Sequence, residues 1–479
     1  MMGKIEEMLK EFKPCFSHAA TYTWFVIVII GLIVRYDHHG VSSFVRCFSL
    51  DPASYKCLLH YFRTPSWDLK VVIRYWVKIV IKYAHPVKIK GFFVLIADNI
   101  KVAKAAQKMA AVKRMKQKSN NSNKPKFFFG HNHGVVSLLV GTATKFSAIP
   151  LMAAIQEGVQ KLREFQGKQA PVVDGEEKIT IQTMVVQEAI KIVKIMQKPS
   201  LLVLDAYFSV SAPFKMARDC VNKAGEQLLH LIIRAKKNYV GYKVTYNDAG
   251  ELVKGARVKL KKVFKRKDEE FESKEIFVYG EKRTISYYTM DLIWNPLMDI
   301  IRFVWVIDGD DKIMLMSSTR ELSAVEILQA YGYRFKIEFS FKCLKYLMGA
   351  FSYHFWTKAL PKLKSKSSID LNQIKDEKKQ KLIADTATAI ERFVSLSCIA
   401  LGILQIIAQE FPQKIWQHYA GWLKTKSSTT PSVETTQNVV RNIIYPNLFS
   451  SKNISNSLIF ERLRSKQRDE IYLYEEDAA

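Results

Sequence analysis

Two short stretches of the chain are continuously apolar, and each is followed directly by an aspartate. Residues 92–97 (FFVLIA) precede Asp98, and residues 201–204 (LLVL) precede Asp205. Runs of this kind are typical of strands covered by helices on both sheet faces, as in an α/β fold. If each strand ends at its aspartate, both carboxylates lie at the rim of the sheet, where open α/β sheets bind ligands. A lone aspartate at a strand end is more often a turn former or a helix cap, so this pair needs a second signal.

The second signal is a helical pattern in residues 331–345. Tyr331, Arg334, Glu338 and Lys345 stand at offsets of 0, 3, 7 and 14 residues. At about 100° per residue, their side chains fall within an arc of about 60° on one face of a single helix. An ordinary surface helix also shows a polar stripe beside an apolar one. The identity and spacing of these four residues favour a functional site.

The stretch YGYRFKIEFSFKCLK resembles the YREK signature of bacterial insertion-sequence transposases with a DDE catalytic triad. The resemblance implies an RNase H-like catalytic core in which Asp98, Asp205 and Glu338 are catalytic and bind the metal. It also implies two Mg²⁺ or Mn²⁺ ions per active site, which suit hard carboxylate ligands. Tyr331, Arg334 and Lys345 would then hold DNA phosphates next to the cut.

Further DNA-binding residues are predicted around this core. Residues 101–126 contain nine Lys or Arg and no acid, which indicates either a loop that grips DNA or an ordinary solvated face. The RAKKN stretch at 234–238 also resembles the family. The full set of predicted DNA-binding residues is Tyr331, Arg334, Lys342, Lys345, Lys101, Lys104, Arg234, Lys236 and Trp294.

Trp294 belongs to a β-rich segment, residues 231–316, which the resemblance implies to be an insertion in the core. In hairpin-forming relatives an aromatic side chain of this insertion stacks on a flipped base, and stacking of this kind is worth about 1–3 kcal/mol. Asn295 and Pro296 follow Trp294, which should place it at a strand end, whereas Trp305 lies mid-strand. Most aromatic residues in strands are simply part of the core, and that alternative stays open.

The composition fits a DNA-binding protein without identifying one. The chain has 73 Lys and Arg against 45 Asp and Glu, a formal net charge of +28, which suits contact with many phosphates. Ribosomal proteins, membrane-surface proteins and nucleases share such a charge. Six cysteines without a CxxC pair predict reduced thiols in a cytoplasmic protein. The transposase resemblance implies that this protein is nucleoid-associated. The His131-Asn132-His133 stretch spells the name of a nuclease motif, but it is expected to hold a satisfied structural histidine beside a strand at 135–140.

Two apolar runs, 25–34 and 393–408, are expected to be buried core helices. The first is too short to cross a bilayer, which needs about 20 apolar residues, and Ser395, Ser397 and Gln405 interrupt the second. No membrane partner is therefore expected.

Five segments are predicted along the chain. Residues 1–85 form an N-terminal helical, DNA-binding module that resembles a helix-turn-helix layout around Asp51-Pro52, or else a packing module that does not contact DNA. Its basic and aromatic residues include Arg35, Arg63 and Trp76. Residues 86–230 form the first part of the core, 231–316 the insertion, and 317–360 the second part with the YREK helix. Residues 361–479 form a Lys/Ser linker, C-terminal helices and a polar tail. The tail is expected to be weakly ordered from 424 onward, apart from a short segment that Ile444 and Phe449 could dock.

The function expected from the resemblance is transposition of an insertion sequence. The protein would cleave and transfer DNA strands at the inverted repeats of the transposon and at the target, acting as a homodimer on paired ends. Two alternatives stay open. The first is a transposase-derived DNA-binding protein without activity, and the second is a cytosolic RNase H-like nuclease without strand transfer.

Overall fold

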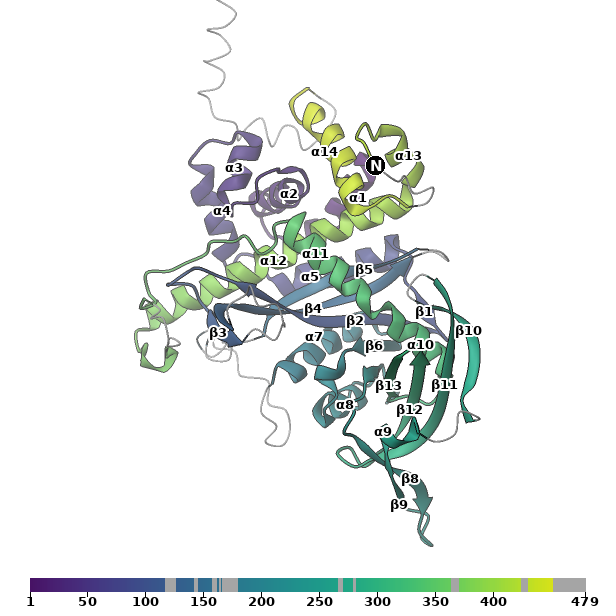
Figure 1. Cartoon of the computed structure of the whole chain (residues 1–479). Coiled ribbons are helices and arrows are strands. Elements are labelled where there is room, and N and C mark those ends of the chain that lie inside the picture. Colours follow the sequence, from purple (N-terminus) through teal and green to yellow (C-terminus); the bar gives the residue numbers. More distant parts are fainter. Residues whose placement is uncertain are drawn as a thin grey trace, which may run out of the picture.

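A computed structural model describes residues 1–116, 126–141, 145–156, 162, 165, 180–265, 270–278, 281–362, 370–423 and 430–450. Its centre is a mixed sheet of 13 strands with helices packed against it, so the chain belongs to the α/β class (Figure 1). The strand order is β3-β4-β2-β6-β7-β13-β12-β11-β8-β9, and β5 pairs with β4, β1 with β2, and β10 with β11.

The first half of the sheet is built from strands between residues 88 and 234. They are β1 (Lys88–Ile89), β2 (Phe92–Ala103), β3 (Lys113–Lys116), β4 (Phe127–Gly141), β5 (Phe146–Ile155), β6 (Ser200–Leu204) and β7 (Leu229–Arg234). β2, β4 and β5 are antiparallel neighbours, whereas β2, β6 and β7 are parallel to one another.

The second half comes from the β-rich segment. Its strands are β8 (Val240–Tyr246), β9 (Leu252–Lys259), β10 (Glu272–Val278), β11 (Glu281–Trp294), β12 (Asp299–Asp308) and β13 (Asp311–Ser317), with a short helix α9 (Leu260–Val263). β13 pairs with β7, so these strands continue the core sheet instead of forming a separate layer. β7 itself, expected within the insertion, is parallel to β6 and belongs to the core sheet. Figure 1 shows the β8–β9 hairpin projecting from the body of the protein.

Alternating side chains of β2 enter two different cores, as expected for a strand covered on both faces. Phe92, Val94 and Ile96 join a core with α10 (Ala324–Gly332) and α11 (Lys336–Tyr346). Phe93 and Leu95 join the larger core on the other face. The prediction of a strand buried on both faces is therefore confirmed, although β2 continues past Asp98 to Ala103.

The larger core is covered by helices from three parts of the chain. They are α5 (Leu69–Tyr83), α7 (Ile181–Met196), α8 (Ser211–Arg218) and α12 (Glu377–Glu410). α12 contacts β5, where Ser395 Oγ donates a hydrogen bond to the Ala153 carbonyl (3.2 Å) and Gln405 Nε2 donates one to the Ala148 carbonyl (3.1 Å). Both polar side chains of this apolar helix are therefore hydrogen-bonded inside the protein.

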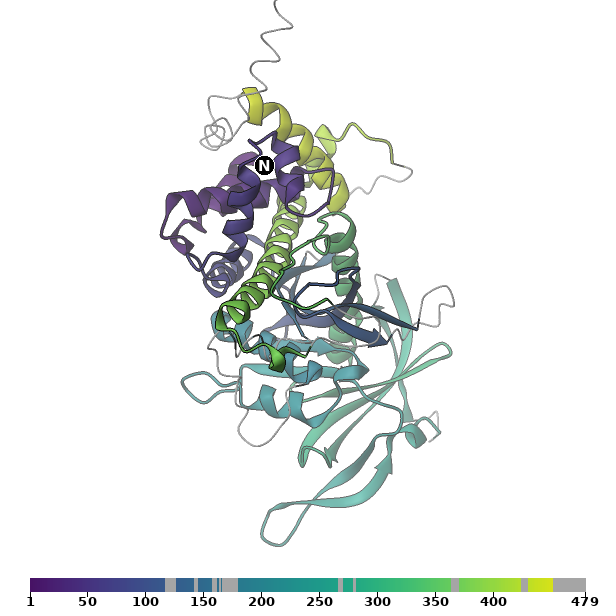
Figure 2. The ribbon, with the colours of Figure 1, turned by 90° about the vertical axis from the view of Figure 1, so that its left-hand side faces the viewer.

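The N- and C-terminal helices pack together. They are α1 (Met2–Lys10), α2 (Ala19–Val34), α3 (Ser42–Phe48), α4 (Ser54–Arg63), α13 (Pro412–His418) and α14 (Val433–Ser450), with 3₁₀ turns η1 (Lys13–Cys15) and η5 (Leu371–Gln373). α2 contacts both α12 and α14, and Figure 2 shows α12 running beside the N-terminal helices. The 1–85 segment is helical as predicted, but it shares its core with the C-terminal helices.

Several expectations for these helices are corrected by their packing. Weak order was expected from 424 onward, apart from a short segment docked by Ile444 and Phe449. The buried Ile444 confirms its docking, but the ordered segment is the whole helix α14, in which Val440 is also buried and Arg441 donates to the Val34 and Arg35 carbonyls. Arg35 and Trp76 are fully buried and unable to contact phosphates. The Arg35 guanidinium instead donates to the Gly40 and Met348 carbonyls and to Ser43 Oγ. Residues 451–479 of the predicted tail and 363–369 of the linker lie outside the described residues.

α12 is long and apolar enough to cross a membrane, by length and composition alone. Within the protein, 94% of its most apolar 18-residue window is buried. Arg392 near its middle donates to the Phe62, Thr64 and Trp67 carbonyls. This packing is that of a core helix.

Candidate functional site

Asp98 and Asp205 lie on neighbouring strands in the same register. β2 and β6 pair with Val94 opposite Leu201 and Ile96 opposite Val203, and two residues further this register brings Asp98 opposite Asp205. Because side chains alternate along a strand, both aspartates extend the rows that face α10 and α11. β6 ends at Leu204, and the Asp205 carboxylate caps the 3₁₀ turn η2 (Ala206–Phe208) by accepting from the Tyr207 N–H (2.8 Å).

Glu338 reaches the same place from the first turn of α11. Arg334 connects it to the sheet: its Nη1 lies 3.4 Å from Asp98 Oδ2, and its Nη2 lies 3.2 Å from Glu338 Oε1. One guanidinium therefore joins two carboxylates from distant parts of the chain. Ser340 helps to fix α11, because its hydroxyl donates to the Ala148 carbonyl of β5 (2.7 Å).

The predicted single helix over 331–345 is wrong. α10 ends at Gly332, a 3₁₀ turn η4 (Tyr333–Phe335) follows, and α11 begins at Lys336. The Tyr333 ring packs on Phe146 of β5 with centroids 4.6 Å apart. A 3₁₀ turn has about 3.0 residues per turn instead of 3.6, so it rotates Tyr331 relative to Arg334 and Glu338. Tyr331 accordingly points into a neighbouring pocket.

Burial and neighbouring charges shift the pKa values of Asp98 and Arg334. Burial raises the pKa of Asp98 to about 6; the backbone hydrogen bond from Asn99 and the Arg334 charge oppose this rise, and the Asp205 and Glu338 charges add to it. Burial lowers the pKa of Arg334, but the charges of Tyr331, Asp98, Glu338 and Asp205 outweigh it and leave that pKa raised. The Asp205 charge acts on both groups, which agrees with its place beside them.

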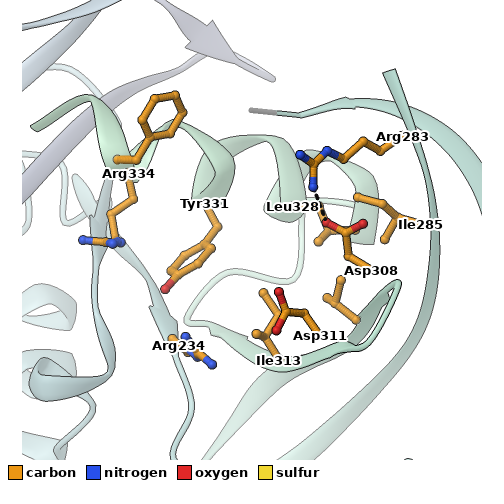
Figure 3. Close-up of a pocket in the computed structure, with 11 residues that line it drawn as sticks. Arg234, Arg283, Ile285, Asp308, Asp311, Ile313, Leu328, Tyr331 and Arg334 are labelled. Atoms are coloured by element: carbon orange, nitrogen blue, oxygen red, sulfur yellow. Dashed lines mark hydrogen bonds and ion pairs between the residues drawn. The ribbon is translucent and has the colours of Figure 1, made fainter. Parts of the chain in front are cut away.

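A pocket of about 260 Å³ borders Arg334 on the side of the β-rich segment (Figure 3). Arg234, at the end of β7, lines it together with Tyr331 and Arg334, so three predicted DNA-binding residues meet here. The pocket also contains acids that sequence reasoning missed, Asp308 and Asp311. Asp308 pairs with Arg283 (3.1 Å). The only signal in the sequence was a DGDD turn, which is typical of an ordinary solvated hairpin.

The predicted lysines fall at three places. Lys342 and Lys345 are exposed on α11, the helix of Glu338. Lys101 is exposed on β2, and its ammonium donates to the Lys116 carbonyl of β3 (3.3 Å). Lys236 is half-buried just after β7, with Nζ 5.9 Å from the Tyr239 ring centroid. Lys118 and Lys124 of the acid-free run lie outside the described residues.

Lys104, predicted to bind DNA, belongs instead to a buried polar cluster. Its ammonium donates to the Phe351 carbonyl and lies 3.5 Å from the Tyr353 ring centroid, and burial lowers its pKa to about 7. The fully buried His131 and His133 contact the Tyr353 hydroxyl at 2.6 Å and 2.9 Å. His131 is hydrogen-bonded through both ring nitrogens, to Tyr353 and to the Ala110 carbonyl, so the expectation of a satisfied histidine is confirmed for His131. His133 Nδ1 is buried without a hydrogen-bond partner among the described residues. Lys104 is held between β2 and the chain near Tyr353, and the DNA-binding prediction for it is wrong.

Trp294 ends β11 beside a turn, as predicted, but its side chain is in the core. It is 2% exposed, with its ring 5.4 Å from the Phe214 ring of α8 and 5.4 Å from the Tyr239 ring. Neither face of the indole is open to a base, so this arrangement contradicts its predicted stacking role. Trp305 is fully buried and donates to the Leu260 carbonyl (2.9 Å).

The three acids offer the donor set that Mg²⁺ or Mn²⁺ prefers, because all their ligand atoms are carboxylate oxygens. Asp98 and Asp205 share one register and one face, and Glu338 is joined to Asp98 by Arg334. Among the described residues, however, no three His, Cys, Asp or Glu side chains are already close enough to hold a metal ion. The residues fit such ions chemically, and the Arg334 guanidinium lies between two of them.

No family model matches the chain, and no curated protein is significantly similar to it.

Proposed function

We propose that this protein is a DDE transposase of the YREK-signature group, which cleaves DNA strands and transfers them to a target. The observation that carries the proposal is the contact of Arg334 with both Asp98 and Glu338, beside Asp205. Arg334 and Asp98 are 236 positions apart in the sequence. Residues selected from the sequence as one site therefore meet.

The strand order supports an RNase H-like core as part of this proposal. β5-β4-β2 are antiparallel and β6 and β7 are parallel to β2. An RNase H-like core is a mixed sheet with flanking helices, and this sheet likewise combines antiparallel and parallel strands under helices. Asp98 lies on β2, Asp205 directly follows the parallel neighbour β6, and Glu338 lies on a helix that covers the same face.

The chemistry requires an attacking oxygen in line with the leaving oxygen and relief of charge at phosphorus. Two divalent cations supply both functions when bound. The protein contributes three carboxylates: Asp98 on β2, which is partly shielded from water, Asp205 after β6, and the exposed Glu338 on α11. Arg334 can bind a phosphate through two N–H groups, whereas the exposed Lys342 and Lys345 act as point charges. Positioning and charge, without a covalent enzyme intermediate, suffice for this reaction.

The test uses a supercoiled plasmid that carries the gene with its natural flanking DNA, because an insertion sequence has its ends there. We expect Mg²⁺- or Mn²⁺-dependent cleavage and joining by the wild type. D98N, D205N and E338Q should each lower the cleavage rate roughly 1,000-fold or more, since several kcal/mol of transition-state stabilisation are lost. DNA binding should persist in all three. D248N, on the exposed turn between β8 and β9, is the matched control and should cleave normally.

The outcomes separate the three candidate functions. Cleavage without joining would identify a nuclease, and DNA binding without cleavage in either metal would identify an inactive DNA-binding descendant. Full activity of any of the three acid variants would contradict the proposed site.

A further inference from the structure

The Arg334 guanidinium occupies the space between two of the three proposed metal ligands. It touches Asp98 Oδ2 through Nη1 and Glu338 Oε1 through Nη2. The Arg334 and Asp98 side chains are only 20% and 23% exposed, so their attraction is less screened than that of a surface pair. Both contacts are charge-assisted, but at 3.4 Å and 3.2 Å they are longer than the roughly 2.7–2.9 Å of the strongest such bonds, so another partner can replace them.

Formal charges show that Arg334 and the metal ions compete for the same oxygens. Asp98, Asp205 and Glu338 contribute three negative charges, which one arginine only partly balances. Two divalent cations would bring four positive charges and reverse the sign of the cluster. The guanidinium would then be repelled by ions bound at the carboxylates that it now contacts.

Arg334 has both an alternative partner and room to move. A DNA phosphate accepts two parallel N–H bonds from a guanidinium, the same fork that now holds the two carboxylates. The pocket of about 260 Å³ is lined by Arg334 and by Asp311, but not by Asp98 or Glu338. Arg334 also lies in the 3₁₀ turn η4 between α10 and α11, not inside a continuous α-helix.

We propose that Arg334 is an electrostatic gate that couples metal binding to DNA binding. Without DNA it competes with divalent cations for Asp98 and Glu338; a phosphate of bound DNA draws it away and opens both carboxylates to the ions. The inference rests on the proposed function, because it takes the three acids as metal ligands. By linkage, the factor by which DNA tightens metal binding equals the factor by which the metal tightens DNA binding.

The experiment measures Mn²⁺ affinity from the electron paramagnetic resonance signal of free Mn²⁺, with and without a mixed-sequence DNA duplex. Binding by the duplex alone is subtracted. Wild-type protein should bind Mn²⁺ about tenfold more tightly or better when DNA is present, within the range usual for coupled sites. R334A should bind Mn²⁺ that much more tightly without DNA and gain little from adding it. R334K should fall between them, because an ammonium cannot bridge two carboxylates as a fork does.

The matched control is R283A, which removes one positive charge from the same pocket without touching the bridge. Its Mn²⁺ affinity should equal that of the wild type, and circular dichroism should show that every variant is folded. Equal Mn²⁺ affinity of wild type and R334A without DNA would overturn the gate while leaving the metal site intact. Tighter binding by R334A with no effect of DNA on the wild type would overturn the coupling. If no folded variant binds Mn²⁺ even with DNA, the proposed function itself fails.

Discussion

Asp98, a proposed metal ligand, is ionised in the folded protein at a cost to stability. It extends the buried row Val94 and Ile96, so its carboxylate stands where the strand leaves the core. Burial raises its pKa from 3.8 to about 6, which means that the ionised form is disfavoured in the folded protein. Perturbed acids of this kind are common at functional sites.

The first prediction is therefore that D98N stabilises the protein above pH 6. Between pH 3.8 and about 6 the folded state binds more protons than the unfolded state, so wild-type stability falls as the pH rises through this window. At pH 7 the ionised carboxylate costs at most about 3 kcal/mol, and Arg334 keeps Glu338 as a partner in the variant. Urea unfolding should show D98N more stable by about 1–3 kcal/mol at pH 7 and equal to the wild type near pH 3.

The control is D219N, which removes a carboxylate that is 73% exposed. Its stability should follow that of the wild type across the whole pH range. A D98N protein that is less stable than the wild type at pH 7 would show that the carboxylate is favoured, not strained, in the fold.

Sequence reasoning at this scale worked where one chain segment determines a residue's surroundings. Asp98 and Asp205 each follow an apolar run, and that run alone predicts both the strand and the row in which the acid lies. It failed for Lys104 and Trp294, because their burial depends on partners elsewhere. Lys104 is covered by Phe351 and Tyr353, and Trp294 by Phe214 of α8. Nothing within a few residues of either position signals these contacts.

At the scale of elements, helix packing against β5 determines where the site lies. Trp76 of α5 donates to the Pro150 carbonyl (3.0 Å), and the same indole lies against Gly402 of α12. Hydrophobic patterning could predict α12 as a buried helix. It could not predict the full extent of α14, because two of its polar side chains, Gln437 and Arg441, are held by hydrogen bonds to backbone carbonyls at the end of α2. The 3₁₀ break at 333–335 was missed for the same reason, since Tyr333 packs on a distant strand.

The second prediction concerns this packing. A Cβ at position 402 would lie 2.2 Å from a ring carbon of Trp76 and 2.9 Å from Ile149 Cγ2. The hydrogen bond from Trp76 prevents a simple shift of the ring, so G402A should lower the free energy of unfolding by about 1–3 kcal/mol, the usual cost of overpacking. G3A is the matched control, because a Cβ there meets nothing within 4 Å. Thermal unfolding that is equally unaffected by both substitutions would contradict the tight contact.

At the scale of the whole molecule, the net charge of +28 is the property that the sequence alone established. The sequence also predicted the α/β class and most strands of the β-rich segment. It could not show that these strands join the core sheet through β13 and β7, because strand pairing between distant segments has no local signal.

The third prediction is that DNA affinity is mainly electrostatic. The logarithm of the association constant should fall linearly with the logarithm of salt concentration, by about 0.9 for each phosphate neutralised. K342A and K345A, on exposed positions of α11, should each reduce that slope by about 1. K10A, on α1, removes an equal charge from the helical layer and should leave the slope unchanged. If the DNA affinity of the wild type did not change with salt concentration, the net positive charge would not be what binds DNA, and the prediction would be wrong.

The central claim is that Asp98, Asp205 and Glu338 hold catalytic metal ions, and a metal-specificity switch at Asp205 tests it most directly. A thiolate is a soft ligand that suits Mg²⁺ poorly and tolerates Mn²⁺ better. D205C should therefore lose plasmid cleavage in Mg²⁺ by roughly 1,000-fold and recover a substantial part of it in Mn²⁺, whereas D205A should recover none. Cleavage by D205C at the wild-type rate in Mg²⁺, or equal recovery by D205A, would contradict metal binding at this residue.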